Sequence, residues 1–220
     1  MENRLNTRAN ISSLTWVGLL LSLFGMLVAR QIVSYFWPTL TFNAALWKEA
    51  LIWVCAIVVL LIALRGERLP LTSIGIGTTT WSKSILWGLL LAVICTVIAG
   101  VLVPLTGYGH GPGSEAFSKL PLWLVTLIVL RAGIVEELLY RGYAIERLQA
   151  FGLNRYLAGA IPLIIFGFGH WTGGWANIVI ALALGGVLTA FYLWRRDLVA
   201  NMIGHFTVDF AANILPKLFS

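Results

Sequence analysis

Charged residues are scarce in this chain. Only 11% of its 220 residues are charged, whereas 59% are hydrophobic, and the mean hydropathy is +0.89. An average soluble domain carries roughly 25% charged residues. The composition therefore excludes an ordinary soluble domain and predicts an integral membrane protein.

Cysteine is rarer still. The two cysteines, Cys55 and Cys95, both lie inside apolar runs, which excludes a disulfide framework and a cysteine-based metal site, and we interpret both as packing residues. The chain also lacks a GxGxxG loop, a Walker loop, an HExxH motif and a serine-protease elbow. The chemistries that depend on those motifs are therefore not indicated.

Acidic residues are outnumbered by basic ones, 9 to 15, which gives a formal charge of +6. In a soluble chain this bias would suggest nucleic-acid binding. Here the basic residues occupy short connections between apolar runs, where such residues set membrane orientation. We expect no nucleic-acid partner.

Long hydrophobic runs dominate the chain. A helix needs about 20 apolar residues to cross a bilayer, and unbroken apolar runs favour helices over the alternating strands of a barrel. The sequence predicts one all-α polytopic membrane domain over residues 1–220, and its uncleaved first span ends near Trp37. The seven expected spans are residues 14–37, 44–64, 84–105, 120–145, 157–172, 174–194 and 198–215.

The loop charges predict an orientation. In a seven-span arrangement, the basic residues of one side are Arg4, Arg8, Arg65, Arg68, Lys83, Arg147, Arg155, Arg195 and Arg196, and those of the other are Lys48, Lys119 and Lys217. The positive-inside rule then places the N-terminus in the cytoplasm and the C-terminus outside. The glycine-rich segment 106–119 is expected to be a flexible outer loop.

A few ionisable residues remain inside the expected spans: Arg30, Arg131, Glu136, Glu137, Arg141, His170, His205 and Asp209. Such residues are costly in lipid and usually mark a functional site. Most of them belong to three groups, "EELLYR", "FGFGH" and "HFTVD". Arg30 is interpreted as an interfacial anchor. Arg131 lies five residues before Glu136, off its face of an α-helix, and has no evident partner.

Helical spacing relates the residues within each group. Glu137 and Arg141 are four apart and can form an ion pair, whereas Glu136 is rotated by about 100° from Glu137. His205 and Asp209 are also four apart. From the cytoplasmic ends of their helices, Glu136, His170 and His205 lie about 16, 22 and 14 Å deep at 1.5 Å per residue. The sequence thus predicts one buried polar site near the middle of the membrane.

This combination of residues suits hydrolysis. A glutamate can act as a general base toward water, and a histidine beside it can hold that water or donate to a leaving amine. A second histidine can stabilise the oxyanion of a tetrahedral intermediate.

The three groups resemble, in order, the motifs EExxxR, FxxxH and HxxxN/D of the CAAX protease and bacteriocin-processing family, which includes the type II CAAX prenyl endopeptidases. The resemblance covers roughly residues 120–215, the expected protease core. It implies an intramembrane endopeptidase of the glutamate type that opens toward the cytoplasm.

The resemblance also implies roles for individual residues. Glu136 would be the catalytic base, assisted by His170, while His205 and the residue at 209 would stabilise the oxyanion. Glu137 and Arg141 would form a supporting ion pair, and Phe166 would pack the wall of the site. Asp209 stands where eukaryotic members carry asparagine, and an ionised carboxylate cannot donate a hydrogen bond. If it is ionised, Asp209 is expected to orient His205.

Two alternatives stay open. Glu136, His170 and His205 could instead bind zinc, although no cofactor is expected, or the chain could be a non-catalytic chaperone or immunity protein. The expected partners are the lipid bilayer and a peptide precursor or membrane-protein substrate. The expected location is a bacterial inner membrane, and the sequence indicates neither the substrate nor the oligomeric state.

Overall fold

A computed structural model describes residues 12–109 and 112–219, and all regular secondary structure within them is helical. Each of the seven segments predicted as spans is largely helical there. The elements are α1 (Ser13–Phe36), α2 (Phe42–Leu61), η1 (Ile62–Gly66), η2 (Leu71–Ile74), α3 (Trp81–Thr106), α4 (Pro112–Ser118), α5 (Leu122–Arg131), η3 (Ala132–Ile145), α6 (Glu146–Ala150), α7 (Arg155–Phe168), η4 (Trp171–Gly173), α8 (Gly174–Arg195), α9 (Leu198–Asn213) and α10 (Leu215–Leu218).

Side-chain caps mark where several helices begin. Ser12 and Thr15 form a capping box at α1, and the Thr41 side chain accepts from the backbone of Ala44 at α2. Asp197 caps α9 in the same way. These caps satisfy backbone donors that a helix leaves free at its first turn, so the helix starts follow from local sequence.

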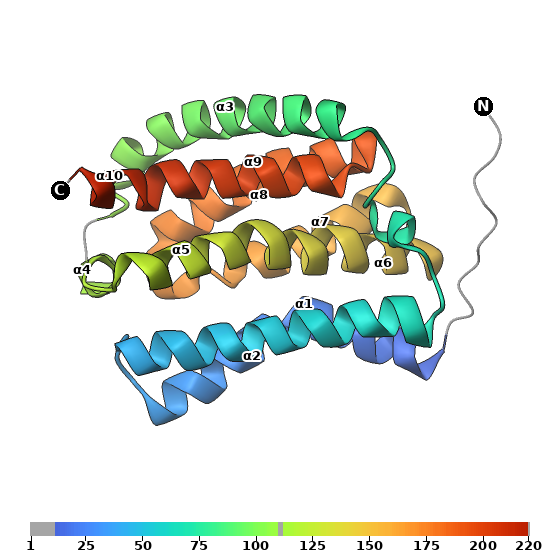
Figure 1. The fold of residues 1–220 in the computed structure, drawn as a ribbon, viewed down its shortest axis with the longest axis horizontal. Helices are drawn as coiled ribbons and strands as arrows, with labels where there is room; N and C mark the ends of the chain where they lie inside the picture. The colour runs from blue at the N-terminus through green and yellow to red at the C-terminus, as the bar shows by residue number, and fades with distance from the viewer. Residues whose placement is uncertain (1–11, 110–111, 220) are drawn as a thin grey trace.

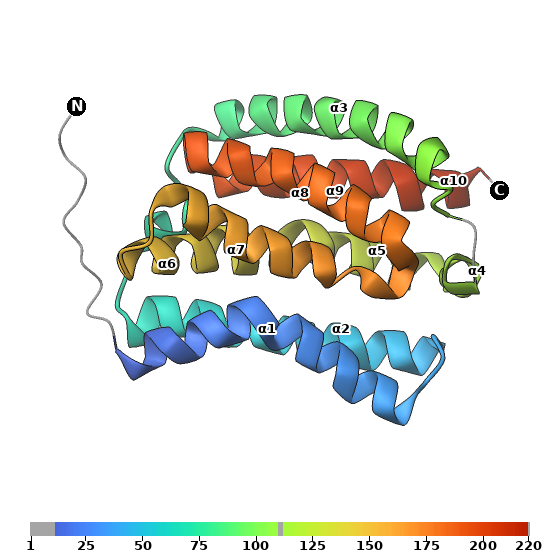
Figure 2. The same cartoon turned by 180° about the vertical axis from the view of Figure 1, so that it is seen from behind.

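The helices form a bundle with α1 and α2 at one face and α3 at the opposite face (Figure 1). Between them lie the continuous rod α5–η3–α6, then α7, α8 and α9, as the view from behind also shows (Figure 2). The π-helix η3 packs against α1, α2, α7 and α9, so it is the central element. The start of α1 and the end of α10 lie at opposite ends of the bundle.

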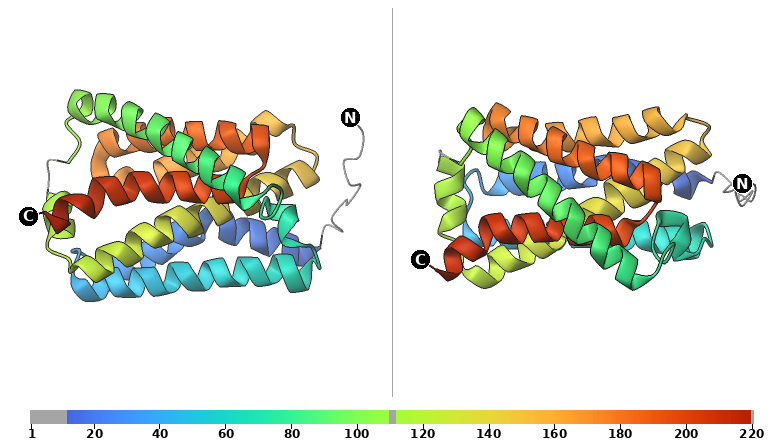
Figure 3. Two further views of the ribbon diagram at one scale, coloured as in Figure 1. Left: turned by 45° about the horizontal axis from the view of Figure 1, so that its top comes forward. Right: turned by 90° about the horizontal axis from the view of Figure 1, so that it is seen from above.

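Helix α3 lies obliquely across α8 and α9 (Figure 3). Two glycines allow the close crossing with α9. A Cβ atom on Gly88 would lie 2.6 Å from Cβ of Ile203, and one on Gly204 would lie 2.8 Å from Cβ of Leu91. Small residues are the usual means by which membrane helices approach closely.

Four helical stretches in the described part of the chain are long and apolar enough to cross a membrane: Ser13–Phe36, Phe42–Gly66, Trp81–Thr106 and Trp171–Arg195. Helix α7, at Arg155–Phe168, is apolar but shorter. Large hydrophobic side chains on α3, such as Leu86, Val93 and Val97, point outward and are exposed. These features support an integral membrane protein.

The expectation of a flexible loop over residues 106–119 is wrong for much of that segment. Thr106 belongs to α3, which ends where Gly107 adopts a left-handed φ of 68°. Residues Pro112–Ser118 form the short helix α4. Proline is favoured at the first helical position because its missing N–H would be unpaired there anyway. His110 and Gly111 lie outside the described residues.

Candidate active site

The "EELLYR" group lies on a π-helix. Residues Ala132–Ile145 form η3, which continues directly from α5. Its backbone hydrogen bonds run from residue i to i+5 and not to i+4, and π-helical turns often occur at functional sites. Because each turn is wider than in an α-helix, side chains five residues apart return to neighbouring positions.

This geometry corrects the interpretation of Arg131. Its Nη1 atom donates to Oε1 of Glu136, five residues later. The pairing was not predicted because the segment was read as an ordinary α-helix, in which the two side chains face different directions.

Arg131 has a second acidic partner, which its spacing from other residues in the sequence does not indicate. Its Nε atom donates to Oε2 of Glu49 on α2 at 3.0 Å. Glu49 is only 1% exposed. The sequence carries a signal for this residue, because Glu49 is an ionisable residue inside the expected span 44–64.

Glu137 is the centre of a second polar group. Its Oε1 atom accepts from Nη1 of Arg141 at 2.9 Å and lies 2.8 Å from Nδ1 of His205. Its Oε2 atom accepts from Nδ2 of Asn201 at 3.0 Å. The predicted Glu137–Arg141 ion pair is therefore present, and it is fully buried.

Arg141 is also held by α8. Its Nη2 atom donates to the carbonyl of Gly185 at 3.1 Å, and its Nε atom donates to Oγ1 of Thr189 at 3.3 Å. Neither Thr189 nor Asn201 was singled out from the sequence. Asn201 lies four residues before His205, on the same helix face, and this spacing could have identified it.

His205 faces three carboxylates. Its Nδ1 atom contacts Glu137, while its Nε2 atom lies 3.7 Å from Oδ2 of Asp209 and 4.0 Å from Oε2 of Glu136. Only Glu137 is within hydrogen-bond distance. The i,i+4 spacing predicts that an ionised Asp209 orients His205, but Glu137 makes the closer contact.

His170 lies in the turn that follows α7. Its Nδ1 atom is 2.8 Å from the carbonyl oxygen of Phe166. The Phe166 ring centroid lies 4.7 Å from that of His170 and 6.5 Å from that of His205, and the Arg141 guanidinium stacks over the same ring at 4.6 Å. Phe166 thus packs between the two histidines, and its place in the wall of a catalytic site stays a prediction.

Arg30 holds the turn that carries His170. Its Nη1 atom donates to the carbonyl of Gly169 and lies 3.3 Å from Oγ1 of Thr172. The Arg30 guanidinium therefore has partners within the protein, and its place at the membrane interface stays a prediction. A groove lined by Leu27, Arg30, Gln31, Phe168 and Trp171 lies beside this turn.

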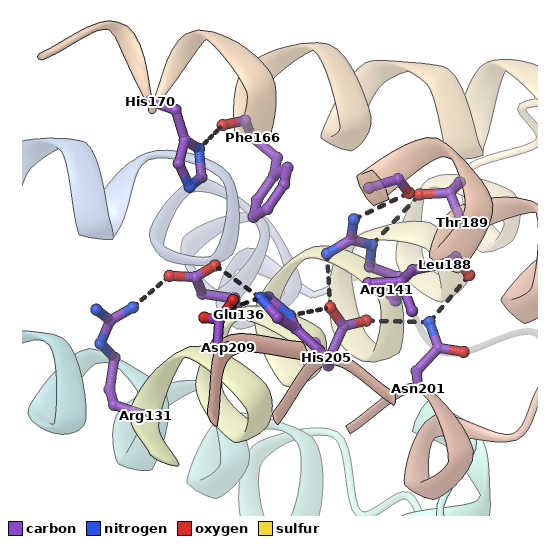
Figure 4. A network of polar contacts seen from close by, with 12 residues as sticks. Arg131, Glu136, Arg141, Phe166, His170, Leu188, Thr189, Asn201, His205 and Asp209 are labelled. Carbon is purple, nitrogen blue, oxygen red and sulfur yellow. Dashed lines mark hydrogen bonds and ion pairs between the residues drawn. The ribbon is translucent and has the colours of Figure 1, made fainter. Parts of the chain in front are cut away.

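The predicted residues converge from three helical segments (Figure 4). Glu136 comes from η3, His170 from the turn after α7, and His205 and Asp209 from α9. The His170 side chain points toward Glu136, and Asp209 lies beside His205. The Glu136 side chain is 7% exposed, whereas the Asp209 side chain is 32% exposed. The site is therefore sheltered at Glu136 and more open at Asp209.

The acidic groups of the site face cations. Glu136 contacts Arg131 and Glu137 contacts Arg141. Within residues 12–109 and 112–219, no three or more His, Cys, Asp or Glu side chains are grouped as a metal site would require.

Comparison with known proteins adds a family relationship. Residues 118–211 match the family model described as type II CAAX prenyl endopeptidase Rce1-like. Neither a curated protein nor a solved structure matches the chain. The matched region contains η3, α7, α8 and nearly all of α9, and hence all three predicted motifs. The resemblance drawn from those motifs is confirmed over residues 118–211, which supports a membrane-embedded protease of the CAAX type.

Proposed function

We propose that this protein is an intramembrane endopeptidase of the glutamate type, in which Glu136 activates water to hydrolyse a peptide bond. Its substrate would be a membrane-associated protein or a peptide precursor. The observation that carries the proposal is the placement of Oε2 of Glu136 opposite Nε2 of His205 at 4.0 Å. That separation is too long for a direct hydrogen bond and suits a shared water molecule.

In this mechanism, Glu136 takes a proton from the water as its oxygen attacks the carbonyl carbon of the substrate. The Arg131 guanidinium contacts Oε1 of Glu136, which leaves Oε2 for the water. His170, whose side chain points toward Glu136, would help to hold the water. The proton then passes to the leaving amine as the C–N bond breaks.

His205 would stabilise the oxyanion. When both ring nitrogens carry hydrogen, Nδ1 donates to Glu137 at 2.8 Å. Nε2, which faces the water before the attack, can then donate to the negative charge that develops on the carbonyl oxygen of the substrate. An ionised Asp209 accepts hydrogen bonds but cannot donate one. We therefore assign the oxyanion contact to His205, and we assign to Asp209 the role of a neighbouring acceptor at the more open side of the site.

We further propose seven membrane spans, with the N-terminus in the cytoplasm of a bacterium and the protein in its inner membrane. Besides the four long apolar helices, α5–η3–α6, α7 and α9 would cross the bilayer. The ionisable side chains of these three segments would face the protein interior and not the lipid. The connections η1–α3, α6–α7 and α8–α9 lie at one end of the bundle (Figure 1) and carry basic residues, which supports this orientation.

The proposal can be tested without a known substrate. New peptide termini would be compared by mass spectrometry in membranes that contain wild type or Glu136→Gln at matched levels. Glu115→Gln is the matched control, because Glu115 is exposed on α4 and far in sequence from the motifs. We expect termini that appear with wild type and Glu115→Gln but not with Glu136→Gln.

Two outcomes would redirect the proposal. Identical profiles for wild type and Glu136→Gln would overturn the assignment as a protease and favour a non-catalytic role. Loss of the wild-type termini after complete metal chelation, with recovery on adding zinc, would show a zinc enzyme in place of the metal-independent mechanism.

A further inference from the structure

The α1–α2 hairpin lies outside the segment that matches the protease family, yet it contributes a charged residue to the candidate site. We propose that Glu49 on α2 is a positioning residue that acts through Arg131 on the catalytic base Glu136. This inference rests on the proposed function of Glu136. It extends the functional unit beyond residues 118–211 to the second helix of the chain.

The contacts form a chain of three buried side chains. Oε2 of Glu49 accepts from Nε of Arg131 at 3.0 Å, and Nη1 of the same guanidinium donates to Oε1 of Glu136. Glu49, Arg131 and Glu136 are 1%, 6% and 5% exposed. Because two different nitrogens of one planar group are used, the position of Glu49 fixes the plane of the guanidinium and hence the direction of its bond to Glu136.

Packing alone does not account for a carboxylate at this position. Oε1 of Glu49 is buried and makes no hydrogen bond, so the side chain carries a desolvation cost that is only partly offset. Replacing a buried ion pair with apolar residues of similar volume is often neutral or stabilising. Its neighbours on the same face of α2, Ala45 and Ile52, are buried and apolar. Fixing Arg131 is a role that an apolar residue could not perform.

The charge balance gives Glu49 a second effect. Arg131 is one cation between two carboxylates, so its attraction is divided between Glu49 and Glu136. If Glu49 were neutral, Arg131 would be free to reorient and to close a one-to-one ion pair with Glu136. Oε2 of Glu136 would then no longer point toward His205, and the Glu136 carboxylate would be a poorer base.

The test is a double-mutant cycle on purified protein, with a synthetic peptide that spans a cleavage site found for the wild type. The variants are Glu49→Gln, Arg131→Gln, the double variant Glu49→Gln/Arg131→Gln, and Glu49→Asp as the conservative replacement. Glu115→Gln again serves as the matched control. Thermal unfolding in detergent identifies the variants that keep the wild-type fold.

We expect Glu49→Gln to lower kcat about 100-fold, the size of loss that misplacement by about 1 Å can cause, while KM stays within about twofold. Glu49→Asp should recover part of kcat. Because Glu49 acts through Arg131, the double variant should be no slower than Arg131→Gln alone. A loss in the double variant that is smaller than the sum of the two single losses indicates that Glu49 and Arg131 act together. The losses caused by independent residues would add.

A folded Glu49→Gln variant with the kcat of the wild type would overturn the inference. Fully additive losses of kcat in the double variant would also overturn it. Either result would leave the proposed protease activity intact. If Glu49→Gln does not fold, the double variant decides the question, because it leaves no unpaired charge between positions 49 and 131. Near-normal kcat in that variant would also overturn the inference. Absence of cleavage by the wild type is a separate result and would refute the proposed function itself.

Discussion

His205 and Glu137 are joined across two helical segments, with Nδ1 of the imidazole 2.8 Å from Oε1 of the carboxylate. That oxygen also accepts from Arg141 at 2.9 Å. The contact fixes the ring of His205 from one side and directs its Nε2 atom toward Glu136 and Asp209. The second glutamate of the "EELLYR" group thus holds a residue of α9 in place.

Glu137→Gln should lower stability more than a surface substitution does. It would leave the buried guanidinium of Arg141 without its carboxylate, and breaking a buried ion pair from one side typically costs about 3–5 kcal/mol. Thermal or denaturant unfolding in detergent measures the effect. Glu115→Gln should unfold like the wild type, and equal stability of both variants would contradict the structural role of Glu137.

Asn201→Asp should also destabilise the protein. The Nδ2 atom of Asn201 donates to Glu137 at 3.0 Å and to the carbonyl of Leu188 at 2.9 Å. An aspartate would place a second carboxylate against the first in a buried position. We expect a clear drop in unfolding temperature. Asn154→Asp is the control, because Asn154 caps α7 and aspartate caps about as well as asparagine. Similar stability of both variants would argue against the Asn201 contacts.

Gly133→Ala should impair activity through the position of α9. A Cβ atom at this residue would lie 2.7 Å from Cβ of Phe206 and 3.0 Å from its backbone nitrogen. The backbone of Phe206 cannot move aside as a flexible side chain can, so α9 must shift. This shift would displace His205, because His205 directly precedes Phe206. We expect a loss in kcat of about 100-fold, measured on the peptide used for the wild type.

Gly100→Ala is the matched control for that substitution. Gly100 lies on α3, and a Cβ atom there would have no neighbour within 4 Å. We expect wild-type activity from it. If Gly133→Ala were equally active, the close approach of η3 and α9 would not be required for the site.

The proposed topology can be tested by cysteine labelling. Ser82 and Ser118 are both exposed, and they lie at opposite ends of the bundle. In a background without Cys55 and Cys95, a membrane-impermeant thiol reagent applied to intact cells should label Ser118→Cys only. Ser82→Cys should react after the membrane is opened. The reverse pattern would show the opposite orientation, and labelling of both in intact cells would refute an odd number of spans between them.

Local patterns predicted two contacts of the candidate site. The i,i+4 spacing of Glu137 and Arg141 correctly indicated an ion pair, and the spacing of His205 and Asp209 placed those side chains 3.7 Å apart. Both relationships lie within a single helix, where sequence distance determines spatial distance. The Arg131–Glu136 contact also lies within one helical rod, but it depends on the π-helical geometry of η3, which the apolar pattern does not reveal.

The sequence by itself determined the helices, because long apolar runs in a lipid environment must satisfy their backbone hydrogen bonds internally. It also determined which ionisable residues the helices carry. Only the tertiary structure decided which of them meet. Glu49 reaches Arg131, and His205 reaches Glu137 in preference to Asp209, because helix packing sets the distances between residues on different helices. Close contacts such as that between Gly133 and Phe206 fix this packing. The spacing of residues along the chain does not reveal which helices pack together.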